Sequence, residues 1–117
     1  MTGAQIIELF DFIASIPQGN GGFPQFSKDV RVIIDKTKDE GAIEELTIGG
    51  SSVDPDRVYR VCTNDYILGG GDGYEVMKKA SDPFNTSLLL SYVVMEYIRT
   101  QQLVQPVIDG RLMVITK

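Results

Sequence analysis

The chain has 117 residues, a formal net charge of −5, one cysteine and no histidine. This is the length of one ordinary domain, and the acidic balance excludes nucleic-acid recognition through a basic surface. Without histidine, the chain forms neither a Ser-His-Asp triad nor a histidine-ligated metal centre. A lone Cys62 excludes an internal disulfide. No apolar run reaches the roughly 20 residues that span a bilayer, and the start shows no signal-peptide pattern.

The first predicted element is a helix over residues 3–15. Thr2 and Gln5, a hydroxyl and an amide three residues apart, have the spacing of a capping box, and apolar side chains follow at helical intervals. Pro17 ends this helix. We expect its apolar face to pack in the core.

A loop is predicted over residues 17–27, which are rich in glycine and proline. The loop also contains Phe23 and Phe26. Two aromatic side chains in such a loop either anchor it on the core or form the wall of a ligand site. The anchoring role is the more common of the two.

Three β-rich runs follow, at residues 30–34, 42–48 and 57–63. A charged turn that ends in Gly41 separates the first two runs, which predicts a hairpin. Residues 49–52 form a second predicted turn before the third run.

The last part of the chain contains a short predicted helical piece at 75–79, a helix at 86–101 and a closing strand at 111–115. Apolar residues occupy nearly every side of the helix 86–101, which predicts burial between layers. Pro106 prevents its continuation.

This order of elements predicts one α+β domain over residues 1–117. The expected architecture is a pair of helices, 3–15 and 86–101, packed on a mixed or antiparallel sheet of about four strands, namely 30–34, 42–48, 57–63 and 111–115.

The functional argument rests on residues 64–74, Asn-Asp-Tyr-Ile-Leu-Gly-Gly-Gly-Asp-Gly-Tyr. Glycine at this density indicates positive φ angles or a close approach to the backbone. The segment is not a phosphate-binding fingerprint, because no Gly-x-Gly-x-x-Gly opens a helix and no Gly-Lys-Ser/Thr follows. One interpretation is a purely structural turn. The other is a rigid turn that presents Asp72 and one exposed tyrosine ring to a flat, hydroxylated ligand.

The same segment resembles the signature of the C-terminal domain of 5′-nucleotidases, roughly Asn-Asp-aromatic-x-x-x-Gly-Gly-Asp-Gly-aromatic. Shorter matches flank it in family order, at residues 23–27, 53–55 with 59–61, and 109–111. Together they cover almost the whole chain. The resemblance implies part of a C-terminal substrate-binding domain, truncated on its N-terminal side and lacking the family's metallophosphoesterase domain.

In this family, the N-terminal domain hydrolyses nucleoside 5′-phosphates with two metal ions, and the C-terminal domain binds the nucleoside. The resemblance implies that Tyr66 stacks on the nucleobase and that Asp72 binds the ribose hydroxyls. It implies no catalytic residue, metal ligand or cofactor in residues 1–117, with divalent metals only in the missing domain, so we expect no phosphatase activity from this chain alone. The family's second stacking aromatic lies before the segment that matches Thr2.

The implied partners are a nucleoside or nucleotide and the metallophosphoesterase domain, on the same or a separate chain, with no nucleic acid and no membrane span. The family is mostly periplasmic, surface-bound or extracellular. Loss of the front of the domain is expected to uncover apolar surface or a sheet edge, so a homodimer is a candidate assembly.

The alternative function is a non-catalytic interaction subunit whose turn at residues 69–73 is only structural. An exposed Tyr66 and Asp72 that face one cleft favour nucleoside recognition. A buried Tyr66, with Asp72 capping a local amide, favours the alternative.

Overall fold

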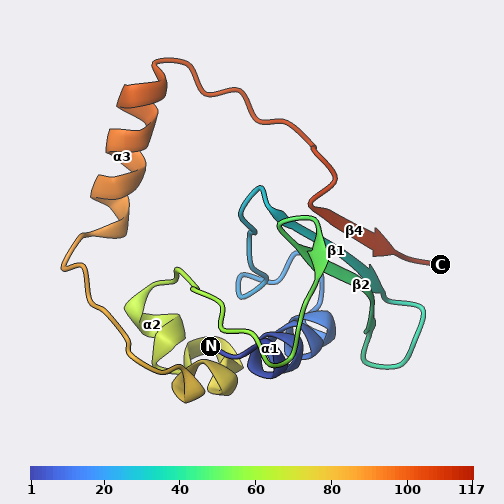
Figure 1. The fold of residues 1–117 in the computed structure, drawn as a ribbon. Helices are drawn as coiled ribbons and strands as arrows, with labels where there is room; N and C mark the ends of the chain where they lie inside the picture. The colour runs from blue at the N-terminus through green and yellow to red at the C-terminus, as the bar shows by residue number, and fades with distance from the viewer.

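A computed structural model describes residues 1–117. Its elements are α1 (Gly3–Ser15), β1 (Val30–Asp35), β2 (Ala42–Ile48), β3 (Ser51–Ser52), α2 (Asp65–Leu68), the 3-10 helices η1 (Gly71–Gly73) and η2 (Glu75–Lys79), α3 (Leu90–Gln101) and β4 (Leu112–Ile115). The strands form one mixed sheet in the order β3-β2-β1-β4. β1 pairs antiparallel with β2 and parallel with β4. The predicted α+β class is confirmed (Figure 1).

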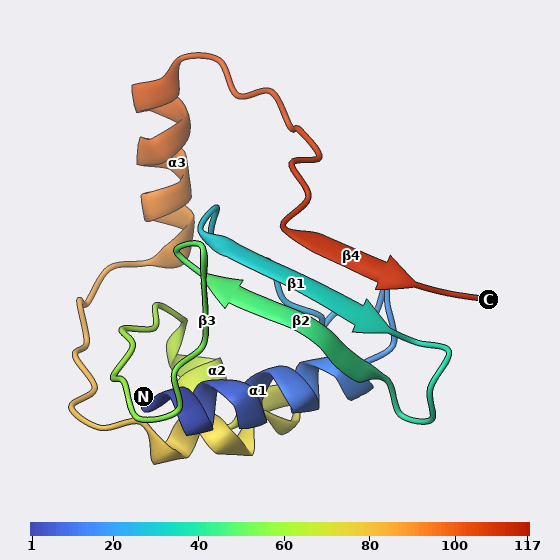
Figure 2. The same cartoon turned by 45° about the vertical axis from the view of Figure 1, so that its right-hand side comes forward.

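Helix α1 begins as the sequence predicts. The Thr2 hydroxyl accepts a hydrogen bond from the Gln5 backbone N–H at 3.3 Å, and the Gln5 side chain accepts one from the Thr2 N–H at 2.9 Å. Figure 2 shows α1 lying along one face of the sheet. A Cβ on Gly3 would lie 1.8 Å from the Asp54 carbonyl oxygen, so glycine is required where the helix start meets that segment.

The core lies between α1 and the sheet. Along β1, Val30, Val32 and Ile34 are buried and alternate with more exposed residues. Burial of each such side chain stabilises the fold by about 1.5–3 kcal/mol. The buried cluster consists of Met1, Ile6, Leu9, Phe10, Ile13, Ala14, Ile16, Val30, Val32, Ile34, Tyr74, Val76 and Met77.

The predicted strand at residues 57–63 is wrong. The segment is extended, but it forms only one isolated bridge, between Val58 and Thr2. The first residues of the chain, rather than another strand, pair with the backbone of this segment. The Gly3 N–H donates to the Arg57 carbonyl and the Tyr59 N–H donates to the Met1 carbonyl, each at 2.8 Å. The backbone of residues 60–63 makes no hydrogen bond within the chain. The fourth strand is instead β3, inside the predicted turn 49–52.

The other strand predictions are confirmed. The run 30–34 is β1, which extends one residue further, and 42–48 is β2. The run 111–115 is β4, which begins at Leu112.

Helix α3 begins four residues later than predicted, at Leu90 rather than Thr86. Ser87 has a left-handed φ of 56°, and its N–H bonds to the Asn85 side chain at 2.8 Å, so the backbone turns away from helical geometry there.

The predicted burial of this helix is also wrong. No residue of α3 is buried, and Figures 1 and 2 both show α3 apart from α1 and the sheet. The Cα radius of gyration is therefore 15.1 Å, compared with about 13 Å for a compact domain of this length. None of the helices combines the length and apolar character needed to cross a lipid bilayer.

Candidate functional site

Tyr66 is presented by a one-turn helix. The Asn64 side chain accepts a hydrogen bond from the Ile67 N–H at 2.8 Å and so caps the start of α2. This turn directs the Tyr66 side chain outward, and the residue is 59% exposed. An exposed ring therefore lies at the first aromatic position of the signature, directly after Asn-Asp.

The ring of Tyr66 lies against the backbone of Gly71. A Cβ on Gly71 would come within 2.5 Å of ring atoms Cε1 and Cζ, so only glycine permits this contact. The Tyr66 hydroxyl donates a hydrogen bond to Oδ1 of Asp72 at 2.9 Å. The ring and the carboxylate therefore form one unit on an open surface.

The glycines set the backbone that places Asp72. Asp72 itself has a left-handed φ of 53°, and Gly70 and Gly73 on either side have φ angles of 85° and 86°. Glycine adopts these angles without steric cost, and aspartate tolerates them better than most residues. Gly70 and Gly73 are thus required for their positive φ angles, and Gly71 is required because the Tyr66 ring lies against it.

Tyr74 has the opposite environment to Tyr66. It is 3% exposed, and its ring packs edge-to-face on Phe12 with 4.9 Å between centroids. Its hydroxyl donates a hydrogen bond to the Gly22 carbonyl at 2.7 Å. Burial, with a smaller effect of the Asp72 charge, raises the pKa of the Tyr74 phenol. Tyr74 is thus a neutral donor that ties the loop 17–27 to the glycine turn.

Loop 17–27 lies beside Asp72. A Cβ on Gly22 would lie 3.4 Å from the Asp72 Cβ, and the Gly22 N–H is held by the Asn20 side chain at 2.8 Å. Sequence reasoning did not connect this loop with Asp72. The available signal was the pair Gly21-Gly22, which is typical of close backbone approach.

The two phenylalanines of the loop act as anchors. Phe26 stacks on Phe10 with 5.3 Å between centroids, and Phe23 packs against the core cluster. Arg111 donates a hydrogen bond to the Phe26 carbonyl at 2.9 Å and a second to Asp109 at 2.7 Å. The bond from Arg111 lowers the pKa of Asp109. The Asp-Gly-Arg segment thus ties the start of β4 to the loop.

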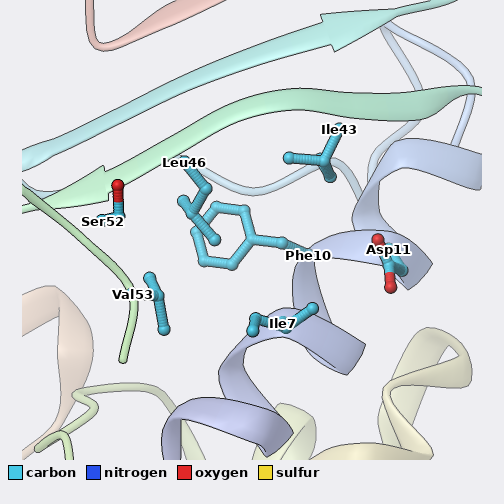
Figure 3. Close-up of a pocket in the computed structure, with 7 residues that line it drawn as sticks. All are labelled: Ile7, Phe10, Asp11, Ile43, Leu46, Ser52 and Val53. Carbon is cyan, nitrogen blue, oxygen red and sulfur yellow. The ribbon is translucent and has the colours of Figure 1, made fainter. Parts of the chain in front are cut away.

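Two hollows lie elsewhere on the molecule. The first, of 270 Å³, lies between α1 and β2 and is mainly apolar. Figure 3 shows Phe10 reaching from α1 toward Leu46 and Val53, with Asp11 at one side. The second, of 340 Å³, opens between the loop 24–29 and the segment 59–63. Neither is lined by Tyr66 or Asp72, and no cluster of three His, Cys, Asp or Glu residues fits a metal ion.

The family model for the 5′-nucleotidase C-terminal domain matches residues 1–79, which include the whole of the glycine turn and Tyr74. The chain belongs to the 5′-nucleotidase C-terminal domain family. Protein UshA of Escherichia coli (strain K12) is 29% identical over 99 residues, which are 85% of this chain and 17% of UshA. The trifunctional nucleotide phosphoesterase protein YfkN of Bacillus subtilis (strain 168) is 32% identical, over 96% of this chain and 8% of YfkN.

A solved structure has the same fold. The 5′-nucleotidase precursor from Thermus thermophilus aligns with 100% of this chain at a TM-score of 0.89 and 24% sequence identity. The chain covers 24% of that structure, and 17% or less of the two curated relatives. These 5′-nucleotidase family members are therefore several times longer than the 117 residues of this chain.

Proposed function

We propose that residues 1–117 bind the nucleoside half of a nucleoside 5′-phosphate, and that a two-metal domain outside these residues hydrolyses the phosphate ester. The observation that carries this proposal is the joined pair of Tyr66 and Asp72, exposed within the family signature. The base stacks on the free side of the Tyr66 ring, and the Asp72 carboxylate accepts hydrogen bonds from the ribose hydroxyls.

The chemistry of both groups supports these roles. A base stacked on an aromatic ring gains about 1–3 kcal/mol and needs no particular base identity. An ionised carboxylate has about four acceptor sites. Tyr66 occupies one acceptor site of Asp72, so others are free for two neighbouring hydroxyls.

The proposal assigns no bond-breaking step to this chain. The chain has no histidine, and its acidic residues form no group that fits a metal ion. Divalent metals therefore belong to the hydrolytic domain in this scheme. With purified chain, a divalent metal and a nucleoside monophosphate, we expect no phosphate release that scales with the chain. The proposed location is periplasmic or extracellular, in keeping with the family.

The binding role is tested by titrating adenosine and inosine against the purified chain and following chemical shifts or heat. Tyr66→Ala is expected to weaken binding about 5- to 150-fold, the equivalent of the stacking energy. Tyr92→Ala is the matched control, because Tyr92 is also about half exposed but lies on α3. Equal affinities for wild type and Tyr66→Ala would show that the ring does not bind the base.

The second candidate is the interaction subunit with a purely structural glycine turn. The exposure of Tyr66 and the absence of any Asp72 bond to a backbone amide count against it. The observation in its favour is that neither of the two hollows described above is lined by Tyr66 or Asp72. If neither nucleoside binds and the fold is intact, this candidate replaces the first.

A further inference from the structure

Asp72 keeps one carboxylate oxygen that the chain itself does not use. The Tyr66 hydroxyl bonds to Oδ1 at 2.9 Å, and no group of the chain bonds to Oδ2. A Cβ on Gly22 would lie 3.5 Å from Oδ2, so the free oxygen lies next to the loop 17–27. A ligand hydroxyl that reaches this oxygen therefore also comes close to that loop.

Asn20 borders the same space as the free oxygen of Asp72. A Cβ on Gly22 would lie 3.3 Å from the Asn20 Oδ1, yet the Asn20 amide and the Asp72 carboxylate make no bond with each other. Because residue 22 is glycine, it places no side chain between the two groups. The loop thus leaves room for a small polar group between an amide and a carboxylate.

The loop fixes Asn20 and leaves it one unused donor. The Asn20 N–H donates to the Pro17 carbonyl at 3.1 Å, and the Asn20 carbonyl accepts from the Phe23 N–H at 3.0 Å. The side-chain Oδ1 accepts from the Gly22 N–H at 2.8 Å, and the Tyr74 hydroxyl holds the Gly22 carbonyl at 2.7 Å. Of the hydrogen-bonding groups of Asn20, Nδ2 alone has no partner in the chain. A held amide donor therefore lies beside a free carboxylate acceptor.

A hydroxyl group is suited to this combination. It donates one hydrogen bond and accepts up to two, whereas an ionised carboxylate only accepts and the NH₂ of an amide only donates. One ribose hydroxyl can therefore donate to Oδ2 of Asp72 and accept from Nδ2 of Asn20. A site that hydrogen-bonds a hydroxyl in this way rejects the analogue that lacks it, because its own polar groups are then left unpaired.

We propose that Asn20 is a specificity-determining residue of this site, which donates through Nδ2 to the oxygen of a ribose hydroxyl bound by Asp72. The ligand class is the nucleosides and nucleotides with an intact ribose, selected against their deoxyribose counterparts. The inference rests on the proposed nucleoside-binding function. It adds a second polar contact, from a loop about fifty residues before Asp72 in the chain.

The test is a chemical-shift titration of the purified chain with adenosine and with 2′,3′-dideoxyadenosine. Asn20→Asp keeps an oxygen acceptor for the Gly22 N–H but removes the amide donor. It should weaken adenosine binding by at least about twofold, the lower limit for one neutral hydrogen bond, and leave dideoxyadenosine binding unchanged. Gln25→Ala is the matched control, because Gln25 is an exposed amide of the same loop that lines the 340 Å³ hollow, which Asp72 does not line. Its affinity for both compounds should equal that of wild type.

A second variant tests the space itself without changing Asn20. Gly22→Ala places a methyl group between the amide and the carboxylate, so adenosine should lose more affinity than dideoxyadenosine. Titrations with 2′-deoxyadenosine and 3′-deoxyadenosine identify the hydroxyl, since the effect of Asn20→Asp should vanish for the compound that lacks it. Circular dichroism checks that each variant is folded.

The comparison separates this inference from the proposed function. If wild type binds adenosine and Tyr66→Ala weakens that binding while Asn20→Asp does not, the role of Asn20 is overturned and the nucleoside site stands. Equal losses of adenosine and dideoxyadenosine affinity in Asn20→Asp would show that Asn20 only supports the loop, which also overturns the inference. If wild type binds no adenosine, the proposed function and the role of Asn20 both fall.

Discussion

The phenol oxygen of Tyr66 lies 2.9 Å from Oδ1 of Asp72, to which it donates a hydrogen bond. This bond joins the two residues to which the family resemblance gives different tasks. The ring is held against Gly71 on one side, and the carboxylate is held by a left-handed backbone between glycines. A nucleoside would therefore meet a preformed pair, which lowers the ordering cost of binding.

The Tyr66→Phe substitution separates stacking from hydrogen bonding. Phenylalanine keeps the ring but leaves Asp72 without its phenol donor. Because stacking uses the ring face, we expect nucleoside affinity to change by less than about fivefold, which is below the range expected for Tyr66→Ala. The Asp72→Asn substitution tests the proposed hydrogen bonds to the ribose. Asparagine keeps the shape of aspartate and tolerates a φ of 53°, but it loses the charge. Calorimetric titration of both variants with adenosine and with 2′,3′-dideoxyadenosine shows whether Asp72 reads the ribose hydroxyls. The dideoxy compound should be insensitive to Asp72→Asn.

The Gly71→Ala substitution should displace the ring. Its Cβ would lie 2.5 Å from the Tyr66 ring, so the ring must rotate away and lose both its support and its bond to Asp72. We expect nucleoside binding to weaken about as much as in Tyr66→Ala. Gly21→Ala is the matched control, because a Cβ there meets no atom within 4 Å. If both alanine variants bind nucleoside like wild type, the packed position of Tyr66 has no functional role.

Tyr74→Phe should destabilise the fold without touching the ligand directly. The variant loses the hydrogen bond to the Gly22 carbonyl and leaves that carbonyl without its phenol partner. The expected loss is about 1 kcal/mol in the free energy of unfolding, measured by urea denaturation. An unchanged midpoint would show that water replaces the phenol at no cost.

The same residue predicts a pH dependence. Burial raises the folded-state pKa of Tyr74 above its unfolded value, so its stabilising contribution is complete below about pH 10 and declines as the pH rises through the folded-state pKa. Wild type should therefore lose more stability than Tyr74→Phe on going from pH 9 to higher pH. Parallel stability curves for the two proteins over this range would contradict the assigned burial effect.

The sequence predicts local structure well where its cause is local. The capping pair Thr2 and Gln5 fixes the start of α1, and β-branched runs give β1 and β2. The run 57–63 has equal β-propensity, but its backbone meets the distant residues Met1 and Gly3 instead of a strand. Strand propensity does not reveal which partner a segment will find.

At the candidate site too, the sequence predicts local backbone structure but not long-range contacts. Glycine density predicts the left-handed angles at Gly70 and Gly73. It does not predict which flanking tyrosine turns inward, because that depends on Phe12 and on the Gly22 carbonyl, more than fifty residues away along the chain. Likewise, apolar residues on every side of α3 predict that other protein surface packs on this helix, but they do not identify that surface.

Arg111 gives a last prediction, because it ties β4 to the loop that lies beside Asp72. Arg111→Ala removes the bonds to both Asp109 and the Phe26 carbonyl, whereas Asp109→Asn removes only the charge of one partner. Arg111→Ala should therefore be the more destabilising in urea, by about 1–2 kcal/mol.

The pair of Asp109 and Arg111 should also affect how the stability of the fold changes at acidic pH. The Arg111 bond lowers the folded-state pKa of Asp109, so the stabilisation is present above the usual aspartate pKa and declines as the pH falls through the folded-state value. Asp109→Asn should flatten the loss of stability below about pH 4, by a small amount because the pair is partly exposed. If wild type and Asp109→Asn lose stability equally between pH 5 and pH 2, the pair does not hold the loop in solution. The loop beside Asp72 would then still be held by the Arg111 bond to the Phe26 carbonyl, which does not involve Asp109.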